Sequence, residues 1–150
     1  MPTMPNATIA KEFTFDAAHS LPNSDGPCRR LHGHTYRVRV VARGPIQPVD
    51  GGAEEGMVVD FARIKEVFKR RIEARCDHQF LNETVPVPRT TAELLAGWIL
   101  GELRAELPQV IAVRLYETPS SYAEVTAADL AGDDDGADTR QAGSPEGYAG

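Results

Sequence analysis

Apolar and polar side chains alternate along two stretches in the first third of the chain. In residues 9–18 the apolar side chains share one parity: Phe13, Phe15 and Ala17. Residues 34–43 repeat the period of two, and the even positions carry Tyr36, Val38 and Val40. Alternate side chains of an extended backbone point to opposite faces, so both stretches are predicted to be β-strands with one buried face.

The apolar spacing changes to three and four residues in the middle of the chain, which is typical of helices with one buried face. A first helix is predicted to follow Asp60, an N-cap residue, and to end near Cys76; its apolar positions are Phe61, Ile64, Val67, Phe68 and Ile72. A second helix is predicted to begin at a capping box formed by Thr90 and Glu93 and to run to about Glu106.

Two more alternating stretches, at residues 110–117 and 122–126, are predicted to be strands. The order strand, strand, helix, helix, strand, strand predicts a single α+β domain over residues 1–126. Two helices with one apolar stripe each can cover only one face of a four-stranded sheet. The other face is therefore left bare or used for assembly.

Charge is concentrated at the end of the chain. The whole chain has a net charge of −6, and residues 127–150 hold six carboxylates and one arginine. These residues are predicted to be a disordered acidic tail because they cannot bury enough apolar surface. The rest of the chain, with 16 acidic and 15 basic side chains, lacks the broad positive surface of a nucleic-acid binder. Five arginines within fifteen residues favour an anionic small molecule or form a solvated face: Arg29, Arg30, Arg37, Arg39 and Arg43.

The length and the remaining composition narrow the class of protein. A chain of 150 residues has room for one domain, and no apolar run approaches the ~18 residues that cross a bilayer, so no membrane segment is expected. The first ten residues do not resemble a secretory signal, which makes the cytoplasm the predicted location. Two cysteines are too few for a disulfide scaffold.

Three of the four histidines lie at strand positions whose side chains are predicted to point to the buried face. His32 and His34 lie on the face of Tyr36 and Val38, and His19 lies on the face of Phe15. If the two strands pair, the three imidazoles meet on the covered face. A hydrogen-bonded core histidine is the alternative for any one of them, but three neutral nitrogens with a fourth position open are typical of a catalytic zinc site. Iron is a weaker option.

Cys28 lies in a predicted loop, beside two arginines that would stabilise a thiolate. It could act as a base or a nucleophile, or close the metal site as a fourth ligand. Cys76, on the apolar side of the first helix, is predicted to be a packed thiol.

Two other positions carry candidate chemistry. Asp77 and His78 either cap a turn or form a pair in which the carboxylate orients an imidazole for general acid–base work. Glu117 continues the buried parity of the third predicted strand, so its carboxylate needs a cationic partner or a ligand with paired N–H donors.

Five motifs occur in a characteristic order between residue 9 and about residue 126: FDAAH ending at His19, CRRLHGH from Cys28 to His34, CDHQFLN from Cys76 to Asn82, Thr91-Ala-Glu93 and Tyr116-Glu117-Thr118. This set resembles the 6-pyruvoyl-tetrahydropterin synthase family. The spacing from the thiol to the H-G-H motif is most similar to the bacterial 6-carboxy-5,6,7,8-tetrahydropterin synthase branch. The acidic tail departs from the family pattern.

The resemblance implies a tunnelling fold, with four-stranded antiparallel sheets joined into a barrel, and a homohexamer of two trimers with sites between subunits. It implies a zinc-dependent carbon-carbon lyase that converts 7,8-dihydroneopterin triphosphate to 6-carboxy-5,6,7,8-tetrahydropterin, acetaldehyde and triphosphate, on the path to 7-deazaguanine compounds such as queuosine. His19, His32 and His34 would hold zinc against the substrate hydroxyls. Cys28, Asp77 and His78 would move protons, and Glu117 with Thr91 would bind the pterin.

Two other functions stay open at this point. The same site could stop at the pyruvoyl product, releasing triphosphate without acetaldehyde. A non-catalytic zinc or pterin-binding protein, closed by Cys28, is the third alternative. For the triphosphate, no spacing rule selects among the candidates Arg29, Arg30, Arg37 and Arg39.

Overall fold

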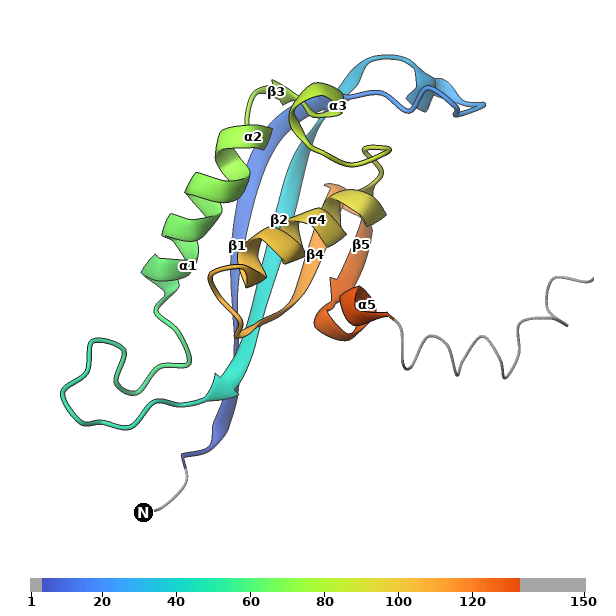
Figure 1. The fold of residues 1–150 in the computed structure, drawn as a ribbon. Coiled ribbons are helices and arrows are strands. Elements are labelled where there is room, and N and C mark those ends of the chain that lie inside the picture. Colours follow the sequence, from blue (N-terminus) through green and yellow to red (C-terminus); the bar gives the residue numbers. More distant parts are fainter. Residues whose placement is uncertain (1–3, 133–150) are drawn as a thin grey trace, which may run out of the picture.

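A computed structural model describes residues 4–132 as one curved sheet with helices packed on one face (Figure 1). The longest strands, β1 (Asn6–His19) and β2 (His32–Pro45), form an antiparallel hairpin. The chain later returns as β4 (Val110–Thr118) and β5 (Ser121–Thr126), both antiparallel to their neighbours. All four predicted strands are present.

The sheet also contains a strand that the sequence pattern did not reveal. β3 (Gln79–Phe80) pairs in parallel with β1, which makes the strand order β3-β1-β2-β4-β5. The sheet is therefore five-stranded and mixed, and the expectation of a four-stranded antiparallel sheet was wrong. Two residues are too few to show an alternation.

The first predicted helix is a continuous helical stretch with a change of pitch. α1 (Phe61–Phe68) passes through a π-helical turn at Lys69–Glu73 into α2 (Ala74–Cys76), and the Asp60 carboxylate accepts the Ala62 N–H at 2.8 Å, as expected of an N-cap. A short helix, α3 (Leu81–Thr84), follows β3.

The second predicted helix is α4 (Ala92–Arg104), and its N-cap differs from the prediction. The capping hydroxyl belongs to Thr91, which accepts the Leu94 N–H at 3.2 Å, so the capping box of Thr90 and Glu93 was wrong. Thr90 is buried and turns toward β1 instead. Either threonine satisfies the sequence pattern, and a tertiary contact decides between them.

The helices cover the sheet face that carries the apolar side chains of β1 and β2. The Phe13 ring stacks on Phe68 of α1 with 4.0 Å between centroids, and Val38 and Val40 are fully buried. The other face carries the polar side chains of these strands. Some of them form ion pairs across strands, such as Arg37 with Glu12 at 3.3 Å. In Figure 1 no helix of the described chain crosses that face.

The predicted tail begins with structure. α5 (Ala127–Ala131) follows a capping box of Thr126 and Asp129, so the first residues of the expected disordered segment are helical. Residues 133–150, to which the rest of that prediction applies, lie outside the described residues. Within residues 4–132 no helix is long and apolar enough to cross a membrane.

An ion-pair network joins the first helical stretch to the end of α4. Glu106 accepts from Arg70 at 2.7 Å and from Arg71, and these bonds lower the pKa of its carboxyl to about 2. A folded-state pKa below the ordinary value stabilises the fold above about pH 4.5, and this contribution disappears as the pH falls from there toward 2.

We expect Glu106→Gln to lower the melting temperature by a few degrees at pH 7, and the difference from the unmodified protein to shrink as the pH approaches 2. Thermal unfolding followed by circular dichroism at pH 7, 4 and 2.5 measures this. Glu73→Gln is the matched control, because Glu73 makes no ion pair within residues 4–132. A Glu106 difference that stayed constant with pH would contradict the electrostatic explanation.

Candidate active site

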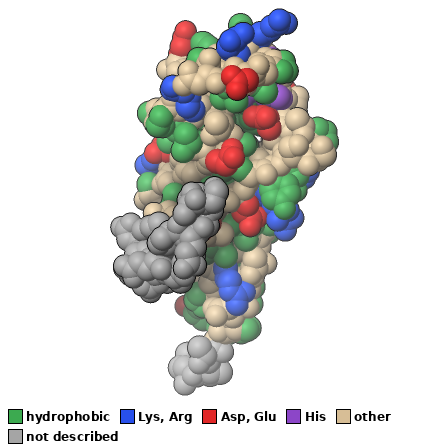
Figure 2. Space-filling view, turned by 90° about the vertical axis from the view of Figure 1, so that its right-hand side faces the viewer, with side chains coloured by type: hydrophobic (Ala, Val, Ile, Leu, Met, Phe, Trp, Pro, Cys, Tyr) green, Lys and Arg blue, Asp and Glu red, His purple; other side chains and the backbone are tan. Residues whose placement is uncertain are grey.

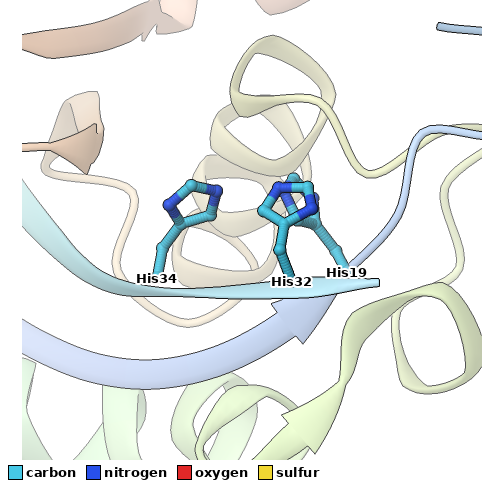
Figure 3. A group of neighbouring side chains, drawn as sticks. All are labelled: His19, His32 and His34. Atoms are coloured by element: carbon cyan, nitrogen blue, oxygen red, sulfur yellow. The ribbon is translucent and has the colours of Figure 1, made fainter. Parts of the chain in front are cut away.

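Three imidazoles converge where the β1–β2 hairpin opens into its connection. The register sets His19 opposite His32 and Ala17 opposite His34, so all three rings point to the helix-covered side of the sheet (Figure 3). One ligating nitrogen from each ring lies within 4.8 Å of the other two. Two adjacent strands thus bring together the three histidines that the sequence placed on a common face.

Hydrogen bonds fix the direction in which two of these rings present their lone pairs. The Nδ1–H of His19 donates to the Thr90 carbonyl at 2.9 Å, and the Nδ1–H of His32 donates to the Arg30 carbonyl at 2.7 Å. A carbonyl only accepts, so Nε2 of each ring carries the free lone pair. These contacts have the pattern of outer-sphere bonds that orient metal-binding histidines.

The unpartnered nitrogens are consistent with a metal site. Nε2 of His19 and Nε2 of His34 are buried and have no hydrogen-bond partner within the described structure. Burial lowers the pKa of both imidazoles, so both are neutral near pH 7 and can donate a lone pair. Three neutral nitrogens can hold a divalent metal ion, and this donor set suits zinc with an open coordination position.

Glu117 borders this group of histidines. Its carboxylate lies 3.7 Å from Nε2 of His19 and 4.0 Å from Nε2 of His34, and its side chain is 26% exposed. From the sequence, the partner of Glu117 could be either an arginine or a ligand. The structure places two imidazoles beside this carboxylate. Together with His34, Tyr116 and Thr118, Glu117 lines a cavity of about 450 Å³, which is large enough for a bicyclic ring.

The structure adds residues that the sequence reading assigned to other roles. Thr90, read as a helix cap, positions His19 through the bond described above. Tyr36, read as a core residue of β2, packs its ring 5.4 Å from that of His34, and its buried hydroxyl has no partner in the described structure. Burial raises the pKa of this phenol, so it stays protonated. No local pattern could have identified either role.

Asp77 and His78 form a second group, next to Asp16. Nδ1 of His78 lies 3.0 Å from the Asp77 carboxylate, which also accepts the Asp16 N–H at 3.1 Å and has a lowered pKa because of that backbone bond and the imidazole. One ligating atom of each of the three residues lies within 4.8 Å of the others. The side chain of His78 is 78% exposed.

The backbone at His78 is strained. His78 has φ of 58°, a left-handed conformation that a residue with a Cβ adopts only at a cost. Its N–H donates to the Asp16 carbonyl at 2.6 Å, while the Asp16 carboxylate accepts the Thr35 hydroxyl at 2.5 Å. Asp16 therefore anchors the pair to the sheet face opposite the three histidines.

Within a single chain the remaining candidates do not join the histidines. Cys28 is half-buried in the 3₁₀ turn Pro27–Arg29, and it is not a member of the three-histidine group. Thr91 uses its hydroxyl to cap α4. Asp77 and His78 form their own group with Asp16, although His78 and His34 line one cavity, and Cys28 belongs to neither group of possible metal ligands.

The two thiols differ sharply in environment. Cys76 is fully buried, and burial raises its pKa to about 12, whereas Cys28 is reachable from solvent. At pH 8 only about one Cys76 thiol in ten thousand would be ionised.

We expect the native protein to react with one equivalent of a disulfide reagent, at Cys28. The Cys76 thiol should react with a second equivalent only after the protein is unfolded. Cys28→Ser should abolish the fast reaction, and fast labelling of Cys76 would contradict the assignment.

The fold and the site together define a class: an α+β domain in which three imidazoles from one sheet converge beside a carboxylate, and the carboxylate and one imidazole line a small cavity. Comparison with known proteins identifies the family. Residues 8–128 match the 6-pyruvoyl tetrahydropterin synthase family, and the chain belongs to this family of enzymes.

Relatives and solved structures agree with this assignment. The chain is 41% identical over 117 residues to 6-carboxy-5,6,7,8-tetrahydropterin synthase of Synechocystis sp., covering 77% of this chain and 89% of the relative. It is 37% identical to the enzyme of the same name from Haemophilus influenzae, covering 77% and 96%. The structure of Caenorhabditis elegans 6-pyruvoyl tetrahydropterin synthase superimposes with a TM-score of 0.74 at 27% identity, covering 85% and 99%.

Proposed function

We propose that this protein is a zinc-dependent 6-carboxy-5,6,7,8-tetrahydropterin synthase. It converts 7,8-dihydroneopterin triphosphate to the carboxy pterin with release of acetaldehyde and triphosphate, in a pathway to 7-deazaguanine compounds such as queuosine. The observation that carries the proposal is the convergence of His19, His32 and His34 beside the Glu117 carboxylate. The names of the 41% and 37% identical relatives support the carboxy product over the pyruvoyl product.

The pterin ring binds in the cavity beside Glu117. A 2-aminopterin presents an amine and a ring N–H side by side, and a carboxylate accepts both through its two oxygens. This anchor directs the side chain of the substrate toward the three histidines. Thr91 contributes to the pterin site from a neighbouring subunit.

His19, His32 and His34 would hold zinc, and the bound ion would make the hydroxyls of the substrate side chain and the adjacent C–H groups more acidic. The Cys28 thiolate accepts a proton from a side-chain carbon. On the other side of the substrate the imidazole of His78, oriented by Asp77, passes a proton between carbon and oxygen. These transfers allow the internal redox step, the loss of triphosphate and the carbon–carbon cleavage, in which one water is consumed and supplies the second oxygen of the carboxylate.

Asp77 and His78 lie in a different ligand group from the three histidines, and we propose that the working site is completed between subunits of a homohexamer. Two features support this assembly. Within residues 4–132 one sheet face carries no helix, and β3 and β5 end the sheet with edges that pair with no further strand of that range, which closure into a barrel would satisfy.

Product analysis tests the proposal. Pure zinc-loaded protein is incubated with 7,8-dihydroneopterin triphosphate, and the products are separated and identified by mass. The proposal requires stoichiometric 6-carboxytetrahydropterin and acetaldehyde. Triphosphate with a pyruvoyl pterin and no acetaldehyde would establish the 6-pyruvoyl-tetrahydropterin synthase alternative, and zinc binding without any turnover would favour a binding protein.

A further inference from the structure

The neighbours of the three histidines lie in a definite order. Glu117 borders the group on the side of His19 and His34, within 4.0 Å of both. The backbone of Arg30 borders it on the side of His32, through the bond from the His32 ring to the Arg30 carbonyl. The 3₁₀ turn Pro27–Arg29 and Arg30 therefore adjoin the edge of the group that Glu117 does not occupy.

The proposed substrate has the same order of parts. Its pterin ring carries the paired N–H donors, its side chain carries the hydroxyls, and the triphosphate terminates the side chain. With the ring at Glu117 and the hydroxyls at the histidines, the triphosphate extends past His32 toward the connection between β1 and β2.

The structure separates the four candidate arginines. Arg37 lies on the uncovered sheet face and lines the cavity beside Glu117; its guanidinium is paired with Glu12 at 3.3 Å and stacked 3.8 Å from the centre of the Tyr116 ring. Arg39 lies on the uncovered sheet face, opposite Glu12 in the register. Both are therefore placed away from the predicted path of the phosphates.

Arg29 and Arg30 belong to the connection between β1 and β2, toward which this path leads. Both are exposed, both line a cavity of about 330 Å³ with Asp25, and neither forms an ion pair with any residue in 4–132. Figure 2 shows several Lys and Arg side chains at the upper end of the molecule. Guanidinium groups match phosphate oxygens through paired N–H bonds, so two unpaired arginines on one cavity suit a polyanion.

We infer that Arg29 and Arg30 bind the triphosphate and determine selectivity for the number of phosphates on the substrate. This inference rests on the proposed function, because the direction of the substrate depends on it. Asp25 shares the cavity and opposes the anion, so removing its charge should have the opposite effect to removing an arginine.

Binding of inorganic tripolyphosphate, followed by isothermal titration calorimetry on the zinc-loaded protein, tests the inference without turnover. We expect each of Arg29→Ala and Arg30→Ala to weaken binding about tenfold, the double variant to lose measurable binding, and Asp25→Asn to strengthen it. Arg43→Ala is the matched control, since this arginine lies at the far end of β2 and donates to Thr8. It should bind tripolyphosphate like the unmodified protein.

Kinetics with 7,8-dihydroneopterin triphosphate gives the second readout. The arginine variants should raise KM for this substrate about tenfold or more, with kcat changed little, and should affect the monophosphate much less. Unchanged tripolyphosphate binding and unchanged KM in the double variant would overturn the inference while leaving the proposed function intact. Loss of tripolyphosphate binding in a protein without turnover would instead uphold the subsite and reject the reaction.

Discussion

Replacing His34 with alanine is expected to remove stoichiometric zinc and to reduce turnover of 7,8-dihydroneopterin triphosphate by about a thousandfold or more. Three nitrogens hold the ion in the proposed site, and loss of a residue that merely orients a ligand already costs about 10–100-fold in affinity. The polarisation that a metal supplies to substrate oxygens amounts to several kcal/mol, which corresponds to a rate factor of this size. Metal content after dialysis and steady-state kinetics measure both effects.

The matched control is His78→Ala, the histidine outside the group. It should keep full zinc occupancy and lose activity, because its imidazole acts on protons in the proposed mechanism. Chelation of the unmodified protein should abolish activity, and added zinc should restore it. Full zinc content in the His34 variant would reject the three-histidine site.

Mixing two inactive variants is expected to restore activity if Cys28 and His78 of different chains serve one site. Cys28→Ala and His78→Ala should each lose about 10²–10⁴ in kcat while keeping zinc. In randomly mixed assemblies about a quarter of the sites combine an intact Cys28 with an intact His78 of the neighbouring chain. Co-expression with two affinity tags, followed by sequential purification, yields the mixed species, which should show about a quarter of the normal turnover per site.

The alternative arrangement gives a different result. If one chain supplied both groups, no chain in the mixture would be intact and activity would stay at the level of the single variants. The doubly substituted Cys28→Ala/His78→Ala chain is the control, because its mixtures with either variant should remain inactive. Restored activity in that control would point to contamination by unmodified protein.

The sequence predicted those parts of the site that depend on strand parity. His19, His32 and His34 share a face because alternation fixes the direction of each side chain, and pairing of consecutive strands then brings them together. Glu117 was identified in the same way, as a carboxylate on an apolar parity, although parity could not name its neighbours. The four main strands and two main helices followed from their periodicity.

The remaining features depend on contacts between distant parts of the chain. The bond from His19 to Thr90 joins residues 71 positions apart, and it selects Thr91 over Thr90 as the helix cap. β3 exists because Gln79 and Phe80 meet the edge of β1, not because of their own pattern. The left-handed conformation of His78 likewise depends on its bond to Asp16. Local sequence carries no signal for any of these.

The pairing of His19 with His32 is the last rung of the β1–β2 ladder before the connection. The positions of His19, His32 and His34 are therefore fixed by the sheet, whereas Cys28, Arg29 and Arg30 belong to the segment beyond that rung. A change in the length or sequence of this segment therefore need not alter the strand register that brings the three histidines together. The hairpin thus holds the three histidines in place independently of the residues in the segment that connects its strands.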